Sequence, residues 1–339
     1  MNYILKNENA IYYECNYSSD NSIFLKLGSS SYFITDSRYT IEAEKLIKNA
    51  KVITSLDIIL SANEIISKSK IKKIIFDPKE WNLLTYNKLI YNLKIIFKQN
   101  PDFSHKKRII KSDDELEIIK KAVKLGEKAF KSLAKEINKN GLKENEYSLT
   151  YTTKSILSNF GKYSLSFDPI VAINQNASKP HALPTNSKLK KNDLLLVDAG
   201  LKYERYCSDR TRTVSIDKDF RFDIEQSFKS KKMQKVYDTV LKAHDVAISK
   251  ARSGMKAKDI DSLTRNIITK AGFGKYFVHS TGHGVGLDIH EMPYISTKSD
   301  IIIEDRMVYT IEPGIYIPNE FGVRIEDMIL MNNGKAEVL

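Results

Sequence analysis

Five residues that can bind metal ions stand in five separate segments of this 339-residue chain. They occur in the segments VDAG, CSDRTRT, STGHGVGLDIHE, TIEPG and VRIED, and are Asp198, Asp209, His283, Glu312 and Glu326. Four carboxylates and one imidazole suit two hard or borderline divalent ions better than one structural zinc ion. Two ions that share bridging carboxylates can hold a hydroxide between them and polarise a carbonyl group. The pattern therefore predicts hydrolytic chemistry.

Each of these residues also has an ordinary structural explanation when it is taken alone. Asp198 would fit a turn, Glu312 a solvated strand end and Glu326 an exposed acidic pair. The apolar residues Leu194–Val197 and Ile311 come just before two of the carboxylates, however, and a carboxylate at the end of a buried strand needs a partner. The sequence contains neither a G-x-S-x-G elbow nor an HExxH motif. The carboxylates taken together therefore favour a metal site.

The segments that carry these residues resemble strands joined by turns. Residues 193–199 are apolar and β-like, and a second strand would carry Asp209 back across them. Residues 307–312 and 322–331 form a similar pair. Strand–turn–strand geometry would bring the two aspartates together and, separately, the two glutamates. His283 lies in a glycine-dense segment, where backbones can approach closely.

Helical patterns separate the two strand pairs. Ser112 and Glu115 form a capping box, and apolar residues at helical spacing follow it as far as Ile137. A second pair of helices is predicted over about 234–252 and 257–271. The order helix, strand pair, helices, strand pair indicates two related halves.

The first hundred residues predict a separate small α/β domain without catalytic residues. The apolar runs Ser22–Leu27 and Ser31–Thr35 flank a Gly-Ser-Ser turn and predict a hairpin. The polar, basic segment Asn100–Lys111 is interpreted as a linker. We therefore expect an α/β (α+β) protein with an N-terminal domain over residues 1–105 and a catalytic domain over residues 112–339.

Composition excludes several other classes of protein. The net charge of +12 invites a nucleic-acid interpretation, but the basic residues are dispersed and not interleaved with aromatic ones, so we expect no nucleic-acid partner. Cys15 and Cys207 lie far apart, which argues against a disulfide framework, and Cys207 is expected to be buried without binding metal. No apolar run suits a membrane span and no signal peptide is evident, so the cytoplasm is the expected location.

The five segments, in their order, resemble those of the pita-bread metallopeptidases, in the branch of proline dipeptidase (prolidase) and aminopeptidase P. The resemblance extends from about Ser112 to the C-terminus, and TDSRY at Thr35–Tyr39 resembles a fragment of the creatinase-type N-terminal domain. It implies a pita-bread catalytic domain with pseudo-twofold helix and strand halves. It also implies a homodimer.

The resemblance implies a role for each of the five residues. Asp198 would bind one ion, Asp209 and Glu326 would bridge both, and His283 and Glu312 would bind the other. Glu312 would also move protons as a general base. Two divalent ions are expected per subunit, with Mn²⁺ first and Co²⁺ or Zn²⁺ as alternatives, because carboxylate-rich ligation does not fix the metal.

Four further residues have substrate-binding or catalytic roles by the same resemblance. His181, in KPHALP, would contact the substrate near the scissile bond, and His290, in LDIHE, would stabilise the tetrahedral intermediate or hold the proline side. His279 would line the pocket, and Arg324 would lie near the bridging glutamate. A lone histidine is often only a core or surface group. Three of the six histidines, however, accompany the histidine of the metal set.

The implied activity is hydrolysis of the Xaa-Pro bond at the N-terminus of proline-containing peptides by a metal-bridging hydroxide. Prolidases carry an arginine soon after the His-Glu pair, which grips the free carboxylate of a dipeptide, whereas this chain has Tyr294 there. This departure favours an Xaa-Pro aminopeptidase, with an Xaa-Pro dipeptidase as the alternative. A non-catalytic binding protein on the same fold is the alternative of another class. Creatinase-like and methionine aminopeptidase-like chemistry fit the sequence less well.

Overall fold

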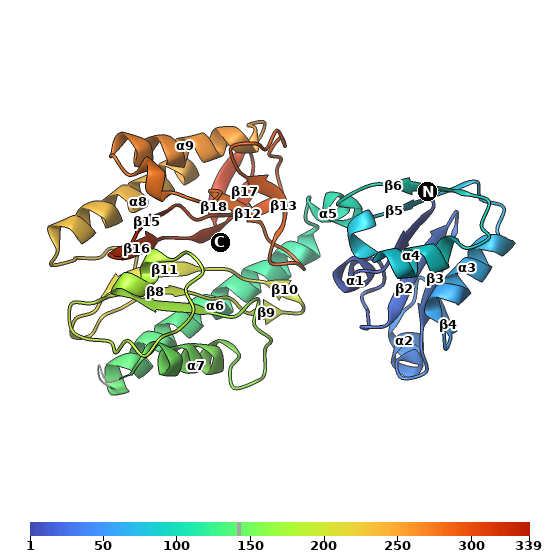
Figure 1. Cartoon of the computed structure of the whole chain (residues 1–339), viewed down its shortest axis with the longest axis horizontal. Helices are drawn as coiled ribbons and strands as arrows, with labels where there is room; N and C mark the ends of the chain where they lie inside the picture. The colour runs from blue at the N-terminus through green and yellow to red at the C-terminus, as the bar shows by residue number, and fades with distance from the viewer. Residues whose placement is uncertain (141–143) are drawn as a thin grey trace. The chain divides into compact units, whose positions relative to one another are not determined.

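The computed structural model describes residues 1–140 and 144–339 (Figure 1). The chain divides into two compact units, Met1–Arg108 and Ile109–Leu339. In the part of the chain that the structure describes, no helix is long and apolar enough to cross a membrane.

The first unit is a mixed six-stranded sheet with helices, in the strand order β4-β3-β2-β1-β5-β6. Its elements are β1 (Tyr3–Leu5), α1 (Glu8–Cys15), β2 (Ser22–Leu27), β3 (Ser30–Thr35), α2 (Thr40–Leu46), β4 (Lys51–Thr54), α3 (Ile58–Lys68), β5 (Lys73–Phe76), α4 (Leu83–Ile90), β6 (Ile96–Gln99) and α5 (Phe103–Arg108). Strands β2 and β3 pair antiparallel, as the hairpin signal predicts. Alternate residues of the central strands point to opposite faces, so Ile23 and Leu25 join one apolar cluster and Phe24 joins the other.

The segment Asn100–Lys111, interpreted as a linker, contains the boundary between the two units but is not extended chain over its whole length. Residues 103–108 form helix α5, whose Phe103 ring lies 5.2 Å from the ring of Tyr3. Arg108 is only 1% exposed and donates to the Ser104 hydroxyl at 3.0 Å. A segment can be basic in composition and still fold, because one apolar anchor and internal partners for the cations are sufficient.

The described residues of the second unit form α-helices and several small sheets that hold the candidate site. Its elements are α6 (Asp113–Asn140), α7 (Glu146–Leu157), β7 (Ile170–Ile173), β8 (Leu194–Asp198), β9 (Lys202–Tyr203), β10 (Tyr206–Cys207), β11 (Thr211–Ser215), α8 (Lys231–Lys250), α9 (Ala257–Lys270), β12 (Gly282–Gly284), β13 (Glu291–Ile295), β14 (Val308–Ile311), β15 (Gly314–Ile317), β16 (Phe321–Arg324), β17 (Asp327–Asn332) and β18 (Lys335–Val338). The predicted capping box is present, since Ser112 N donates to Glu115 Oε2 at 2.8 Å and Glu115 N to Ser112 Oγ at 3.2 Å.

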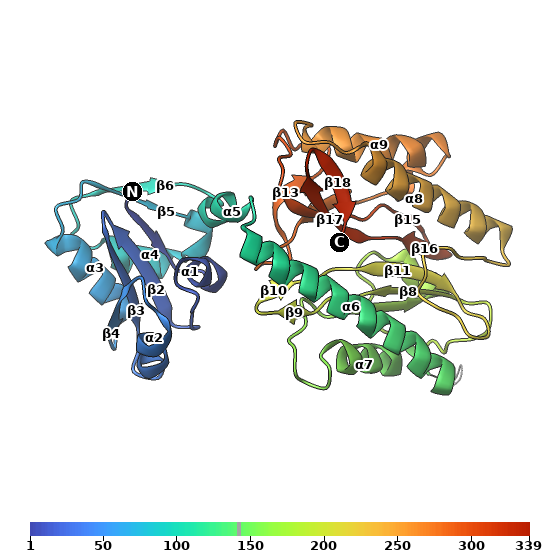
Figure 2. The same cartoon turned by 180° about the vertical axis from the view of Figure 1, so that it is seen from behind.

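The second unit consists of two halves with the same order of elements. Helices α6 and α7 precede the sheet β11-β8-β7, and helices α8 and α9 precede the sheet β13-β12-β14-β17-β18. In Figures 1 and 2, helices α8 and α9 lie on one side of the strands, and helices α6 and α7 lie on the other side. Each half therefore covers a sheet with a pair of helices, and the inner strands of the two halves meet.

The ends of four strands place the candidate ligands. β8 pairs antiparallel with β11 so that Asp198 lies opposite Thr211, and β14 pairs antiparallel with β17 so that Ile311 lies opposite Asp327. A bridge between Thr211 and Glu326 joins the two halves. Asp209 was expected on a strand but lies two residues before β11, in the irregular segment that leads into it. The carboxylates thus stand at strand ends, on backbone that two buried sheets hold in place.

Candidate metal centre

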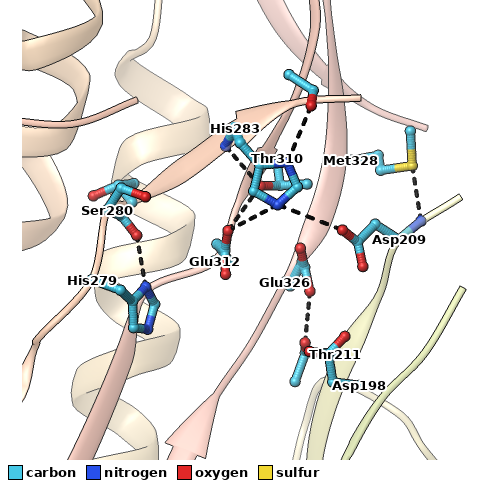
Figure 3. Close-up of polar contacts among 12 residues, drawn as sticks. Asp198, Asp209, Thr211, His279, Ser280, His283, Thr310, Glu312, Glu326 and Met328 are labelled. Atoms are coloured by element: carbon cyan, nitrogen blue, oxygen red, sulfur yellow. Dashed lines mark hydrogen bonds and ion pairs between the residues drawn. The ribbon is translucent and has the colours of Figure 1, made fainter. Parts of the chain in front are cut away.

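Carboxylates from both halves converge on His283. Its Nε2 atom lies 3.3 Å from Glu312 Oε1 and 3.6 Å from Asp209 Oδ2 (Figure 3). One ligand atom each of Asp209, His283 and Glu326 lie within 4.8 Å of one another, and all three residues are buried. This spacing is that of groups able to share a cation.

Close backbone packing holds His283 in this position. A Cβ atom on Gly282 would lie 1.9 Å from the Thr310 carbonyl oxygen, and one on Gly284 would lie 2.2 Å from the Met292 carbonyl oxygen. Only glycine fits such an approach. His283 Nδ1 lies 3.1 Å from the carbonyl oxygen of Gly284, to which it can donate a proton. That bond leaves the Nε2 lone pair directed at the carboxylates, as a metal ligand requires.

Asp198 reaches the same cluster from the end of β8. Its Oδ2 accepts a hydrogen bond from Arg324 Nη2 at 2.5 Å, whereas its Oδ1 is buried and, within the described residues, has no hydrogen-bond partner. A buried carboxylate oxygen without a partner is costly. An atom of this kind, facing other carboxylates, fits a cation.

Electrostatics also fits a cation site. Burial, and then repulsion from neighbouring carboxylates, raises the pKa of Asp209 and of Glu326 well above the usual range. Burial likewise raises the pKa of Glu312. Burial lowers the pKa of His283, which keeps the ring neutral and its lone pair available. Cations placed among these groups would relieve the repulsion that raises the carboxyl pKa values.

The structure places the nine candidate site residues around one cavity of about 660 Å³. They are Asp198, Asp209, His283, Glu312, Glu326, His181, His279, His290 and Arg324. The rings of His283 and His290 are 4.3 Å apart at their centroids and nearly perpendicular. Burial lowers the pKa of His279 and of His290, so both rings can act as neutral hydrogen-bonding groups.

Cys207, two residues before Asp209, is fully buried, as expected. Burial raises the pKa of its thiol to about 11. Because the thiolate and not the thiol binds metals, this residue is a poor ligand beside four carboxylates.

Several residues that support the cluster had no clear signal in the sequence. Tyr316 OH lies 2.9 Å from His279 Nε2 and accepts a hydrogen bond from Arg324 Nη1 at 2.6 Å. Thr211 Oγ1 donates to Glu326 Oε2 at 2.6 Å. Thr211 could have been suspected because it follows Asp209 by two residues. Tyr316, an apolar strand residue in the sequence pattern, is linked to the site only through the pairing of β15 with β16.

A buried arginine holds the backbone behind the cluster. Arg212 is 3% exposed and donates through Nη1 to the carbonyl oxygens of Thr211 and Glu326, at 2.9 and 2.6 Å. Its Nη2 donates to Asp327 Oδ1 at 2.6 Å. These bonds tie β11 to β17 directly beneath the carboxylates of the cavity.

A pseudo-twofold α/β unit with buried carboxylates and histidines around one cavity defines a metal-dependent hydrolase. The pattern of metallopeptidase family M24 matches residues 117–333, and the chain belongs to this family. Family membership implies the use of divalent metal ions.

Related proteins agree with this assignment. An Xaa-Pro dipeptidase of Pyrococcus horikoshii is 37% identical over 243 residues, which are 72% of this chain and 66% of that protein. The structure superposes on an Xaa-Pro dipeptidase from Bacillus anthracis with a TM-score of 0.90 and 30% identity, covering 99% of this chain and 92% of the other. An X-Pro aminopeptidase from Thermotoga maritima gives 0.87 and 29% identity, covering 99% and 94%. The predictions of the family, the fold class and a metallo-exopeptidase are thereby confirmed.

Proposed function

We propose that the chain removes the N-terminal residue from peptides whose second residue is proline, using two divalent ions. Mn²⁺ is the metal expected first. The observation that carries the proposal is the convergence of four carboxylates and His283 in a cavity that three further histidines line. The chemistry of the ligands supports the expected roles. Asp198 would bind one ion, and His283 and Glu312 the other. Asp209 and Glu326 would bridge them.

The protein's own residues have distinct tasks in this reaction. The bound ions would supply an ionised water as the nucleophile and polarise the scissile carbonyl group. Glu312, whose pKa burial raises, would take up a proton and deliver it to the leaving proline nitrogen. His181 would bind the substrate near the scissile bond. His290 would stabilise the charge that develops on the carbonyl oxygen or hold the proline side, and His279, held by Tyr316, would line the pocket.

The lining of the cavity supports a preference for proline. Proline lacks an amide N–H and has a fixed φ angle, so a peptidase that binds its substrate as an added strand loses a hydrogen bond there. This cavity presents histidines together with an apolar wall that includes Phe167, Ile170 and Ile289. Such a lining can hold a pyrrolidine ring without an N–H to recognise.

Tyr294 supports cleavage of peptides longer than two residues. It lies on β13 opposite His283 and lines the cavity, where an arginine would grip the carboxylate of a dipeptide. The described residues that line the cavity include two permanent cations, Lys154 and Arg324. Arg324 is engaged with Asp198, and the ammonium group of Lys154 contacts a carboxylate at 2.7 Å. A dipeptide's free carboxylate would therefore have to compete for its partner.

Dipeptidase activity is the second candidate, favoured by the Xaa-Pro dipeptidases of Pyrococcus horikoshii and Bacillus anthracis among the similar proteins. The test compares kcat/KM for Xaa-Pro and Xaa-Pro-Yaa with added Mn²⁺, with Xaa-Ala-Yaa as a control. Faster cleavage of the tripeptide supports the aminopeptidase, and faster cleavage of the dipeptide supports the dipeptidase. If the protein hydrolyses neither peptide, the proposal is wrong. A Tyr294→Arg variant should shift the ratio toward the dipeptide.

The same proposal includes a homodimer in the cytoplasm. Sedimentation equilibrium on the whole chain tests the assembly, and a mass of one chain at micromolar concentration would contradict it. Cell fractionation tests the location.

A further inference from the structure

Glu146 is a fully buried carboxylate in the first turn of helix α7, with no exposed surface. It accepts four hydrogen bonds. Its Oε1 accepts from Ile173 N at 2.7 Å, and its Oε2 accepts from Asn176 Nδ2 at 2.8 Å, from Thr185 N at 2.7 Å and from Thr185 Oγ1 at 2.6 Å. A buried carboxylate is tolerated only when its oxygens are satisfied in this way. Glu146 therefore fixes whatever carries those donors.

The donors lie on both sides of His181. Ile173 and Asn176 come before it in the chain, and Thr185 comes after it. The loop between them is also closed on itself, because Asn176 Nδ2 donates to the Leu183 carbonyl oxygen at 2.8 Å. A single carboxylate thus holds both ends of the loop that brings His181 to the cavity.

His181 depends on its backbone for its position. Its side chain is exposed and lines the cavity, and in residues 1–140 and 144–339 no hydrogen bond to its ring is found. Because the ring is exposed, its position follows that of the loop backbone. The backbone near Glu146 is also joined to the segment that follows the loop, since Glu146 N donates to Ser187 O at 3.2 Å and Leu189 N to Glu144 O at 3.0 Å.

The second half of the unit contains a related arrangement, in which the buried carboxylate is also paired with Arg265, at 2.8 and 2.9 Å. Asp261, fully buried on helix α9, accepts hydrogen bonds through Oδ1 from Thr281 N at 3.2 Å and Thr281 Oγ1 at 2.9 Å. Thr281 lies between His279 and His283 in the chain. In each half, a buried carboxylate on the second helix anchors a segment that carries histidines of the cavity. Its recurrence in both halves indicates a role in holding those segments.

We propose that Glu146 is the positioning residue for His181: it acts on turnover by holding the His181 loop, without touching the substrate. The inference rests on the proposed function, because it concerns the step in which His181 takes part. Misplacement of a catalytic group by about 1 Å can lower a rate by about 100-fold. A small shift of this loop is therefore expected to lower kcat and to leave the metal ligands unaffected.

The Glu146→Gln variant tests the carboxylate with little change of shape. Glutamine has only one acceptor oxygen. Its NH₂ group replaces the other carboxylate oxygen and therefore faces at least one N–H group that donates to Glu146 in the wild type. We expect kcat for an Xaa-Pro-Yaa peptide to fall about 10- to 100-fold. KM should change less than about 3-fold and metal content should stay at the wild-type value. The control is Glu117→Gln, an exposed position on α6, which should behave as wild type.

A double-mutant cycle with His181→Ala separates positioning from general destabilisation. If Glu146 acts through His181, Glu146→Gln should change kcat less than about 2-fold in the His181→Ala background. If the two losses multiply instead, the inference is wrong. Melting temperatures, measured for every variant, set the assay temperature well below unfolding. Should Glu146→Gln not fold, Thr185→Val takes its place in the cycle, because it removes one of the four donors and keeps the shape of the side chain.

The activity of the wild-type protein distinguishes failure of the proposed function from failure of the positioning role. An inactive wild-type protein with bound Mn²⁺ refutes the proposed function. An active wild-type protein with a multiplicative cycle, or a Glu146→Gln variant with wild-type kcat, refutes only the positioning role.

Discussion

Replacement of Asp209 by asparagine should make the metal-free protein more stable, although the side chain is expected to be essential for activity. Asp209 is 6% exposed and faces the carboxylates of Glu326, Asp198 and Glu312. Burial and repulsion from these groups raise its pKa, so ionising it in the folded, metal-free protein costs free energy. Asparagine has nearly the same shape without the charge.

The magnitude follows from the geometry. Ligand oxygens of Asp209 and Glu326 lie within 4.8 Å of each other. Two charges at that distance repel by about 3.5 kcal/mol at an effective dielectric constant of about 20. Proton uptake relieves much of this repulsion, so the expected gain in the free energy of unfolding is about 1–2 kcal/mol at pH 8.5. For a domain of this size, that corresponds to an increase in Tm of about 4 °C.

The effect has a definite pH dependence. A carboxyl group whose pKa is raised by folding destabilises the folded state above its folded pKa and has no effect below its unfolded pKa of about 3.9. The advantage of Asp209→Asn should therefore be small near pH 4 and should grow as pH rises.

The assay is calorimetry or urea unfolding in EDTA at pH 4.5 and 8.5, with Asp217→Asn, an exposed position, as the control. Added Mn²⁺ should raise the Tm of the wild type more than that of the variant, because the variant has lost a ligand. A variant less stable than the wild type at pH 8.5 in EDTA would refute the electrostatic reasoning.

Three further predictions concern turnover, the core and protons. His181→Ala should lower kcat for Xaa-Pro-Yaa about 100-fold while metal content, measured by mass spectrometry, stays near wild type; loss of metal would mean that its role is misassigned. Leu195→Ala, in the fully buried strand β8, should lower the free energy of unfolding in urea by about 3 kcal/mol, and a cost below about 1 kcal/mol would contradict close packing around this side chain. The apparent affinity for Mn²⁺ should rise with pH, because binding displaces protons from carboxyl groups whose pKa values are raised. Calorimetry in two buffers of different ionisation enthalpy should detect this proton release. The absence of proton release would contradict the prediction.

The strands and helices that support the cavity could be predicted because their patterns are local. The apolar run Leu194–Val197 predicts a buried strand, and the capping box at Ser112 predicts the start of α6; both elements are present. The glycines around His283 predict that another backbone approaches closely. This is found at Gly282, where the Thr310 carbonyl leaves no room for a Cβ atom.

Contacts between distant segments could not be predicted in the same way. Glu146 is separated from Thr185 by 39 residues, and nothing in its own neighbourhood signals a buried carboxylate. Arg108 belongs to a run of basic residues that is typical of exposed chain, yet it is 1% exposed, and its charge acts on the Glu80 carboxylate from an earlier segment of the chain. In such cases the partners are defined only by the register of the strands and the packing of the helices.

Titration of the metal-stripped protein with Mn²⁺, followed by calorimetry and by hydrolysis of an Xaa-Pro-Yaa peptide in the same samples, tests the central claim most directly. We expect two ions per chain, with activity that appears as they bind, and neither full occupancy nor activity in Asp209→Ala and Glu326→Ala. Full hydrolysis in excess EDTA, or wild-type activity in both variants, would contradict the claim that this carboxylate cluster exists to hold catalytic cations.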